Sequence, residues 1–213
     1  MKKIIYFSTV AICLLSCGAS KHNESTGWVS LFDGKSLNGW RVGDNAETFT
    51  IENGAIVAHG NTAHLFYEGA VNQHDFKNFE FKADVMTTPG SNSGIFIHST
   101  FQQASWPKKG YEVQVNNSQS DWRRTGSLYS VDDVREVYVK DNEWFTESVV
   151  VRGKNIIIKI NDKTVVNYNE PDSVAQNVPI GGRRLSSGTF ALQGHDPNSK
   201  VYIKNIMVKP LAD

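Results

Sequence analysis

The stretch NFEFKADVMT, residues 78–87, alternates apolar and polar side chains along its length. This alternation at period two is typical of a β-strand with one face in a core and the other toward solvent. The stretch SGIFIHS, residues 93–99, follows closely and is apolar on both faces, as expected of a central strand that is covered on each side. A third stretch, GYEVQVNNS at 110–118, returns to alternation.

The rest of the chain continues this pattern. Residues 149–168, VVVRGKNIIIKINDKTVVNY, predict strands separated by turns at 152–154 and 161–163. Two more strands are predicted near the C-terminus, and no window shows persuasive helical periodicity. We therefore expect an all-β domain built as a sandwich of two antiparallel sheets.

The length and net charge of the chain limit the number of domains and the classes of binding partner. The chain has 213 residues, which fits one β-sandwich domain, and a formal net charge of +0. Nucleic-acid binding requires a basic excess, so nucleic acid is not an expected partner. A neutral ligand is the default expectation.

The N-terminal segment predicts export and lipid anchoring. Lys2 and Lys3 precede an apolar run at 4–15 that is too short to span a membrane. The sequence Leu14-Leu15-Ser16-Cys17 resembles a bacterial lipobox, so residues 1–17 are predicted as a lipoprotein signal peptide with Cys17 as the lipidated residue. A plain signal peptide is the alternative. Residues 18–26 then form a tether, and we expect a periplasmic or cell-surface protein held on the membrane.

The polar face of the 110–118 stretch is the first candidate site. It carries Glu112, Gln114 and Asn116 in a row, where an ordinary wet face would carry Lys, Thr or mixed charges. Carboxylate and amide groups hydrogen-bond to sugar hydroxyls, and flanking aromatic residues such as Trp106 and Trp122 cover sugar rings. A solvent-facing strand with no function is the alternative interpretation of the same spacing.

Histidines supply the second set of candidates. His195 and Asp196 in LQGHD follow a predicted strand and suit a base with its orienting acid, although a simple turn explains them equally well. Gln193, in the same stretch, is a candidate for sugar contacts. His98 lies on the apolar stretch 93–99, where a buried core histidine is the plain alternative. The histidines form no metal-binding motif, and no cofactor is evident.

Several motifs together resemble the 3-keto-disaccharide hydrolase domain family. WVSLFDGKSLNGWRV at 28–42 is similar to the opening of that family. The similarity continues in chain order through NFEFKADV, SNSGIFIHS, GYEVQVNNS, TGSLY at 125–129, and the stretches 142–166 and 190–211. It covers essentially all of the predicted domain, residues 27–213.

The resemblance implies a concanavalin A-like jelly roll that acts on sugars oxidised at C3, cleaving 3-keto-glycosides such as 3-keto-disaccharides. A ketone at C3 acidifies the C2 proton, so a base can remove it while the C1 oxygen leaves; water then adds to the enone. This hydrolase or lyase chemistry needs a base, a group that stabilises the enolate and an acid. A divalent cation could stabilise the enolate, but no ligand motif supports one.

The resemblance also assigns roles. Glu112 is the leading base or sugar ligand, and His98, Tyr129 and His195 are candidates for acid, enolate donor or orienting group. His98 and Asn116 stand where the family often has other residues, and both are expected to face the site. Two alternatives stay open: a lectin-like binding module on the same fold, and a conventional glycoside hydrolase with Asp121 or Asp196 as second carboxylate.

Overall fold

The computed structural model describes Met1, residues 27–173 and residues 183–212. The predicted lipobox with Cys17, the tether at 18–26 and part of the loop before Arg183 lie outside these described residues. Within them the chain is almost entirely β-structure in two antiparallel sheets, which confirms the predicted fold class.

The described elements are thirteen strands and two short 3₁₀ helices. The strands are β1 (Val29–Ser30), β2 (Trp40–Val42), β3 (Phe49–Glu52), β4 (Ala55–Ala58), β5 (Ala63–Tyr67), β6 (Asn78–Thr87), β7 (Ser93–Ser99), β8 (Tyr111–Val115), β9 (Phe145–Arg152), β10 (Asn155–Ile160), β11 (Lys163–Asn169), β12 (Thr189–Gly194) and β13 (Val201–Leu211). The helices are η1 (Ala46–Thr48) and η2 (Val71–His74).

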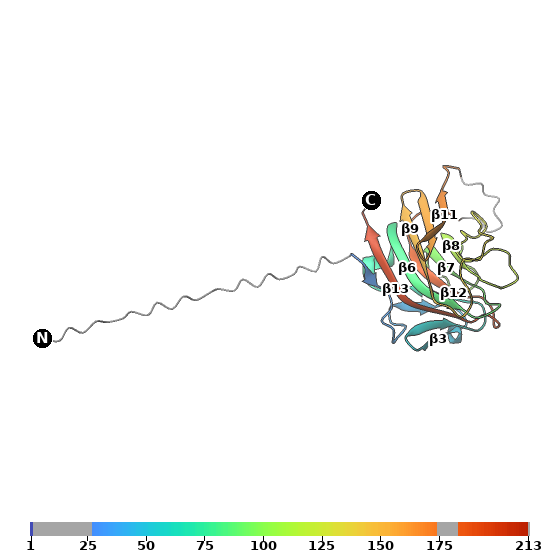
Figure 1. Cartoon of the computed structure of the whole chain (residues 1–213), viewed down its shortest axis with the longest axis horizontal. Helices are drawn as coiled ribbons and strands as arrows, with labels where there is room; N and C mark the ends of the chain where they lie inside the picture. Colours follow the sequence, from blue (N-terminus) through green and yellow to red (C-terminus); the bar gives the residue numbers. More distant parts are fainter. Residues whose placement is uncertain (2–26, 174–182, 213) are drawn as a thin grey trace.

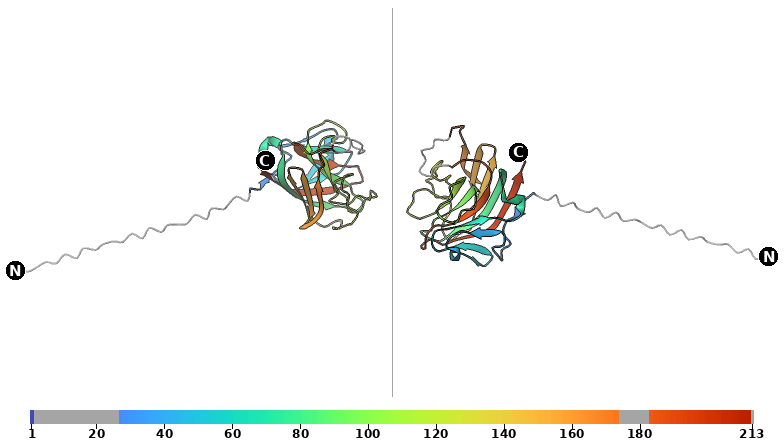
Figure 2. Two further views of the ribbon diagram at one scale, coloured as in Figure 1. Left: turned by 90° about the horizontal axis from the view of Figure 1, so that it is seen from above. Right: turned by 180° about the vertical axis from the view of Figure 1, so that it is seen from behind.

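The strands form one sheet of eight and one of five. The larger sheet has the order β11-β10-β9-β6-β13-β4-β3, with β1 pairing to β13, and the smaller has the order β2-β5-β12-β7-β8. Figure 1 shows β6, β9 and β13 of the larger sheet together with β7, β8 and β12 of the smaller one. The two further views in Figure 2 show the compact sandwich from above and from behind.

The alternation of β6 places its apolar face in the core between the sheets. Phe79 and Phe81 are fully buried, and both pack against Phe190 of β12 in the opposite sheet, with ring centroids 4.9 and 4.6 Å apart. Large aromatic side chains contribute much of the burial free energy of such a core. The sequence period therefore fixes which face of β6 meets the second sheet.

Strand β8 follows the same rule with one difference. Tyr111, Val113 and Val115 enter the core, whereas Glu112 and Gln114 point to the opposite face of the five-stranded sheet. That opposite face is buried too, because all five residues of β8 are buried. The polar row is therefore covered by loops, and the wet-face alternative does not describe it.

Loops after β8 provide that cover. The segment 125–129 runs beside β8, where the Tyr129 N–H donates to the Glu112 carbonyl and the Gly126 N–H to the Gln114 carbonyl, at 3.0 and 2.9 Å. In Figure 1 these yellow-green loops lie beside β8 at the right of the domain. β8 is consequently not a bare sheet edge, and Tyr129 is brought next to Glu112.

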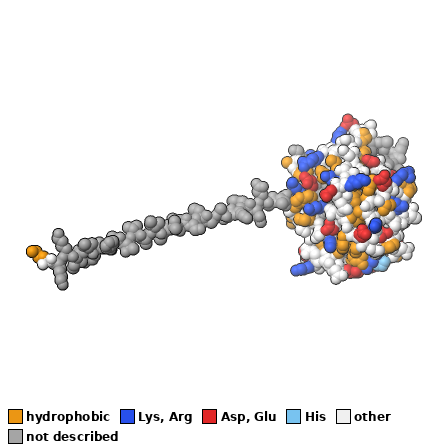
Figure 3. Space-filling model, in the orientation of Figure 1, with side chains coloured by type: hydrophobic (Ala, Val, Ile, Leu, Met, Phe, Trp, Pro, Cys, Tyr) orange, Lys and Arg blue, Asp and Glu red, His pale blue; other side chains and the backbone are white. Residues whose placement is uncertain are grey.

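The face of the molecule shown in Figure 3 has no dominant charge. On the face shown in Figure 3, Lys and Arg side chains are intermingled with Asp and Glu side chains. Among the described residues, no helix is long and apolar enough to cross a membrane.

Candidate active site

A cavity of about 340 Å³ opens on the face of the five-stranded sheet that is turned away from the core. Its strand residues are Glu112 and Gln114 of β8 and Gln193 of β12. Loop residues complete the lining: Asn92, Trp106, Asp121, Tyr129, Arg183 and His195. A concave site with a few convergent polar groups and aromatic rings is the usual form of a small-ligand site.

Gly94 makes room for Glu112. On the sheet face that carries the cavity, Gly94 of β7 stands opposite Gln114 of β8. A Cβ on Gly94 would lie 2.7 Å from Glu112 Oε1, which is closer than side-chain carbon atoms approach oxygen. The missing side chain lets Glu112 lie across β7 toward Gln193 on the next strand.

Glu112 is held by two donors. Arg183 Nη2 donates to Glu112 Oε2 at 3.1 Å, and Gln193 Nε2 donates to Oε1 at 2.9 Å. The Glu112 and Arg183 side chains are 7% and 3% exposed, so this ion pair is shielded from solvent. Burial raises the pKa of Glu112 above its ordinary value, against the opposing charge and hydrogen bond of Arg183. A buried carboxyl group with a raised pKa is a stronger base than one in water.

Several buried polar atoms in this pocket lack a partner among the described residues. They are Gln114 Oε1, Gln193 Oε1, and Nε and Nη1 of Arg183. Gln114 donates its amide N–H to Asn92 Oδ1, at 2.9 Å. Buried polar groups are nearly always hydrogen-bonded, so two acceptors and two donors here are suited to a polar ligand.

Tyr129 and Asp121 form one wall. The Tyr129 hydroxyl lies 3.5 Å from Asp121 Oδ2, and burial raises the pKa of this phenol. The guanidinium of Arg183 lies 5.6 Å from the centre of the Tyr129 ring. Tyr129 is therefore protonated at neutral pH and sits beside the cation that pairs with Glu112.

His195 forms a dyad with Asp196 at the rim. His195 Nδ1 lies 2.6 Å from Asp196 Oδ2, and Asp196 also accepts hydrogen bonds from the Asn198 and Ser199 backbone and the Ser199 hydroxyl. Partial burial opposes ionisation, but these hydrogen bonds lower the pKa of Asp196 below its usual range. Because the carboxylate holds Nδ1, the other ring nitrogen, Nε2, is left to exchange a proton with a ligand. Asp196 itself does not line the cavity but contacts His195, which does.

Trp106 completes the rim beside His195. Their ring centroids are 5.5 Å apart, and Trp106 is 41% exposed. The structure thus brings eight of the predicted residues into one cluster, seven in the lining and Asp196 behind His195. The seven in the lining are Glu112, Gln114, Gln193, Tyr129, His195, Trp106 and Asp121.

His98 is not brought to this cavity. It adopts a φ of 53° at an irregularity in the pairing of β7 with β12, which turns its side chain away from the face that period two assigns. Its Nε2 lies 2.9 Å from the Lys77 carbonyl, and its Nδ1 accepts the Ser186 N–H at 3.2 Å. Both nitrogens are occupied and burial lowers its pKa, so His98 serves as a neutral structural residue.

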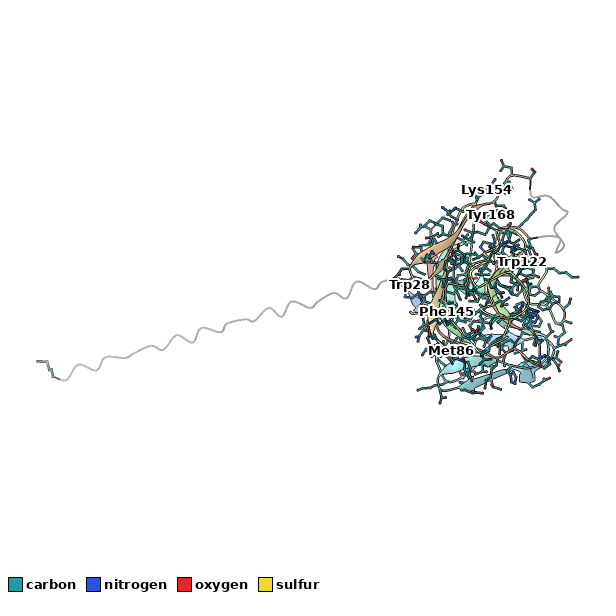
Figure 4. The ribbon with its side chains drawn as sticks, turned by 45° about the vertical axis from the view of Figure 1, so that its right-hand side comes forward. Trp28, Met86, Trp122, Phe145, Lys154 and Tyr168 are labelled. Atoms are coloured by element: carbon teal, nitrogen blue, oxygen red, sulfur yellow. The ribbon has the colours of Figure 1, made fainter. Side chains whose placement is uncertain are left out.

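Asn116 and Trp122 also lie outside the cavity lining. The Asn116 side chain binds the 119–124 loop: it donates to the Asp121 and Arg123 carbonyls, each at 2.9 Å, and accepts the Gln119 N–H. Trp122, labelled in Figure 4, is exposed, and the guanidinium groups of Arg123 and Arg135 lie 4.6 and 3.9 Å from the centre of its ring. Asn116 therefore shapes the loop that carries Asp121. Neither Asn116 nor His98 lines the cavity, although the resemblance led us to expect both to face the site.

Sequence reasoning did not identify Arg183 or Asn92 as site residues. Arg183 is separated from Glu112 by 71 positions, so no spacing links them. The available signal was indirect, because a buried carboxylate requires a cation and the loop at 173–188 carries an Arg pair. Among the described residues no group of three or more His, Cys, Asp or Glu side chains could hold a metal ion.

The fold and this pocket define a β-sandwich domain with a small-ligand site lined by polar and aromatic residues. The model of the 3-keto-alpha-glucoside-1,2-lyase-like domain matches residues 27–209, and the chain belongs to that family. A 3-keto-disaccharide hydrolase from Bacteroides thetaiotaomicron is 28% identical over 174 residues, which are 68% of this chain and 60% of the relative. The match therefore spans less than two thirds of that relative's length.

Solved structures share the architecture. A crystal structure from Parabacteroides distasonis, described as that of a glycosyl hydrolase, has a TM-score of 0.73 at 22% identity and covers 91% of this chain and 98% of its own. A carbohydrate-binding module from Bacillus subtilis has a TM-score of 0.56 at 13% identity, covering 80% of this chain and 95% of its own. At these identities the likeness shows the fold alone.

Proposed function

We propose that this protein is an enzyme that cleaves 3-keto-glycosides by elimination at C1–C2 followed by hydration. The observation that carries the proposal is the buried Glu112, whose cavity-lining partner Arg183 has two nitrogens, Nε and Nη1, without a hydrogen-bond partner among the described residues. This arrangement offers a base and an electrostatic stabiliser side by side, which is what proton removal next to a ketone requires. Family membership supports the substrate class.

Glu112 is the proposed base. It takes the C2 proton, and the C–H electron pair moves into a C2=C3 bond while the C3 oxygen becomes an enolate. The raised pKa of Glu112 suits this transfer, because a base in water-like surroundings would be too weak. The unpaired Nε and Nη1 of Arg183 are the proposed donors to the enolate oxygen, with the Tyr129 hydroxyl nearby.

His195 is the proposed proton donor to the leaving oxygen. As the enolate collapses, the C3 ketone reforms, a C1=C2 bond forms and the C1–O bond breaks, so the departing oxygen needs a proton. Asp196 fixes the His195 ring through its contact with Nδ1. In the second half, His195 deprotonates a water molecule that adds to C1, and protonated Glu112 returns a proton to C2.

Two other functions have specific support. A binding module without turnover is favoured by the amide oxygens of Gln114 and Gln193, which have no partner among the described residues and suit sugar hydroxyls whether or not a bond breaks. A conventional glycoside hydrolase is favoured by Asp121, which lines the cavity with Glu112 as a second carboxylate.

A paired-substrate assay separates the three functions. The purified protein is incubated with a 3-keto-disaccharide and with its unoxidised parent, and products are followed by chromatography. We expect cleavage of the keto form alone, since only a C3 ketone acidifies the C2 proton. Cleavage of both sugars would indicate a glycoside hydrolase, and binding without cleavage would indicate the module.

We also propose that Cys17 carries a lipid that holds the exported protein on a bacterial membrane. The support is the basic start, the short apolar run and the lipobox at residues 1–17. Cys17→Ser should move the protein from the membrane fraction to the soluble fraction or stall its processing. Unchanged membrane fractionation of this variant would contradict the proposal.

A further inference from the structure

A second cavity of about 290 Å³ adjoins the first one across Trp106, which lines both. Loops 43–45 and 102–105 line it, together with residues 62–64 of the β4–β5 turn and β5. His64 of β5 is the direct cross-strand partner of Gln193, which lines the first cavity. Facing side chains on neighbouring strands lie about 5 Å apart, so the two cavities are consecutive recesses on one sheet face.

The wall between the cavities consists of aromatic rings. The His64 and Trp106 ring centroids are 5.4 Å apart, and those of Trp106 and His195 are 5.5 Å apart. Gln102 holds the Trp106 loop in place, because its Nε2 donates to the carbonyls of Ala104, Ser105 and Trp106. The wall is therefore pre-formed, and its exposed tryptophan can contact a sugar ring on either side.

The second cavity is polar and carries little charge. Among the described residues that line it, Asp44 supplies one carboxylate and there is no Lys or Arg. Its other polar lining groups include Asn45, Thr62 and Gln103, and the buried Nε2 of His64 has no partner among the described residues. Burial lowers the pKa of His64 to about 4, so this ring is neutral. Neutral donors and acceptors suit hydroxyl groups better than a phosphate or a carboxylate.

We infer that the second cavity is the subsite for the leaving sugar of a disaccharide, so that the scissile bond crosses the Trp106–His195 wall. This inference rests on the proposed function. It accounts for the position of the His195–Asp196 dyad, because Thr62 of the second cavity donates to the His195 carbonyl at 2.8 Å. A proton donor at the junction of two sugar subsites faces the oxygen that joins them.

The test fills the second cavity and compares two substrates. Ala104 lines it and is exposed, so Ala104→Trp adds bulk there without disturbing the core. The ratio of kcat/KM for a 3-keto-disaccharide to kcat/KM for the methyl 3-keto-glycoside should fall by about tenfold or more. Asp44→Ala is a second variant that removes a polar group instead, and it should lower the same ratio. The matched control is Ala70→Trp, an exposed alanine outside both cavities, which should keep the wild-type ratio.

The outcomes separate this inference from the proposed function. If the wild-type protein cleaves both substrates and Ala104→Trp and Asp44→Ala leave the ratio unchanged, the subsite is wrong and the enzyme stands. If the wild-type protein cleaves neither, the proposed function is wrong, and ligand-observed NMR with glucose decides the subsite. The subsite is then supported if glucose binds, if Ala104→Trp abolishes this binding and if Glu112→Gln retains it. Absent binding, or binding that Ala104→Trp leaves unaltered, overturns the subsite.

Discussion

Glu112 and Glu147 are both buried glutamates, but they lie in different environments. Glu112 is on the face of its sheet that is turned away from the core, whereas Glu147 is on the face of its sheet that packs in the core. Glu112 points out of the five-stranded sheet into a cavity and has Arg183 and Gln193 as donors. Glu147 lies on the apolar face of β9, between Ala83 and Ile160 of the neighbouring strands, and neither carboxyl oxygen has a hydrogen-bond partner among the described residues.

Their surroundings give the two acids different protonation behaviour. Burial raises the pKa of both, but for Glu112 the Arg183 charge opposes this effect. Burial raises the pKa of Glu147 to about 8, with only the Gly126 N–H opposing it, and that N–H already donates to the Gln114 carbonyl. Burial alone thus produces a neutral acid, whereas burial with a cation and an open cavity produces a group that can exchange protons with a ligand.

The largest effect should follow from removing the proton-accepting ability of Glu112. Glu112→Gln keeps the shape and one acceptor oxygen, but it cannot accept the C2 proton, so turnover should fall about a hundred- to ten-thousand-fold. Exchange of the C2 hydrogen in deuterated solvent, followed by NMR, should fall in parallel.

A raised KM with near-normal turnover would instead make Glu112 a sugar ligand. In that case His195 becomes the better base, and His195→Ala should abolish both exchange and cleavage. Glu147→Gln is the matched control for the first experiment, because that residue faces the core and should leave turnover nearly unchanged.

The next effect should come from making Glu112 resemble Glu147. Arg183→Met removes the cation but keeps much of the apolar stem, and breaking a buried ion pair typically costs about 3 kcal/mol or more in free energy of unfolding. Protonation of Glu112 should offset part of this cost, so the loss should be smaller at low pH. Chemical denaturation at two pH values measures both.

A matched control is Arg152→Met, on an exposed arginine that pairs with Glu80 at the surface. Its effect on stability should be small, because exposed ion pairs contribute little. Equal losses for the two variants would contradict the assignment of Arg183 as the buried partner of Glu112.

Local periodicity in the sequence is sufficient to predict the fold class and the two strand residues of β8 that line the cavity. The alternation in residues 78–87 and 110–118 determines which side chains enter the core, because successive residues of a strand point to opposite faces. The same rule places Glu112 and Gln114 together on one face from their spacing alone. Tyr129 is indicated by the family resemblance, and Trp106 by its position in a loop that flanks the strand.

The alternation rule gives the wrong side-chain direction for His98, and it cannot predict that Arg183 lies in the site. The positive φ of His98 reverses its side chain, and nothing in the apolar stretch 93–99 signals that irregularity. Arg183 is 71 positions away from Glu112 in the sequence, so only tertiary folding brings them together. The burial of Glu147 cannot be predicted from the sequence either, because an acidic residue at an apolar position of the alternation simply interrupts the pattern.

The last effect, which is the most informative about the two glutamates, is the dependence of protein stability on the ionisation of Glu147. Its pKa is about 8 in the folded protein and near its ordinary 4.5 in the unfolded chain. Between these values the folded state holds one proton more than the unfolded state, so stability should fall by about 1.4 kcal/mol per pH unit as pH rises. Below 4.5 both states are protonated and the contribution is constant; above about 8 both are ionised and the loss is complete.

Glu147→Gln removes this dependence, so the variant should become more stable than the wild type from about pH 5 upward, measured by urea denaturation across pH. The exposed Glu143→Gln control should follow the wild-type curve. Parallel curves for wild type and Glu147→Gln would mean that this acid is ionised in the folded state, and the contrast with Glu112 would then fail.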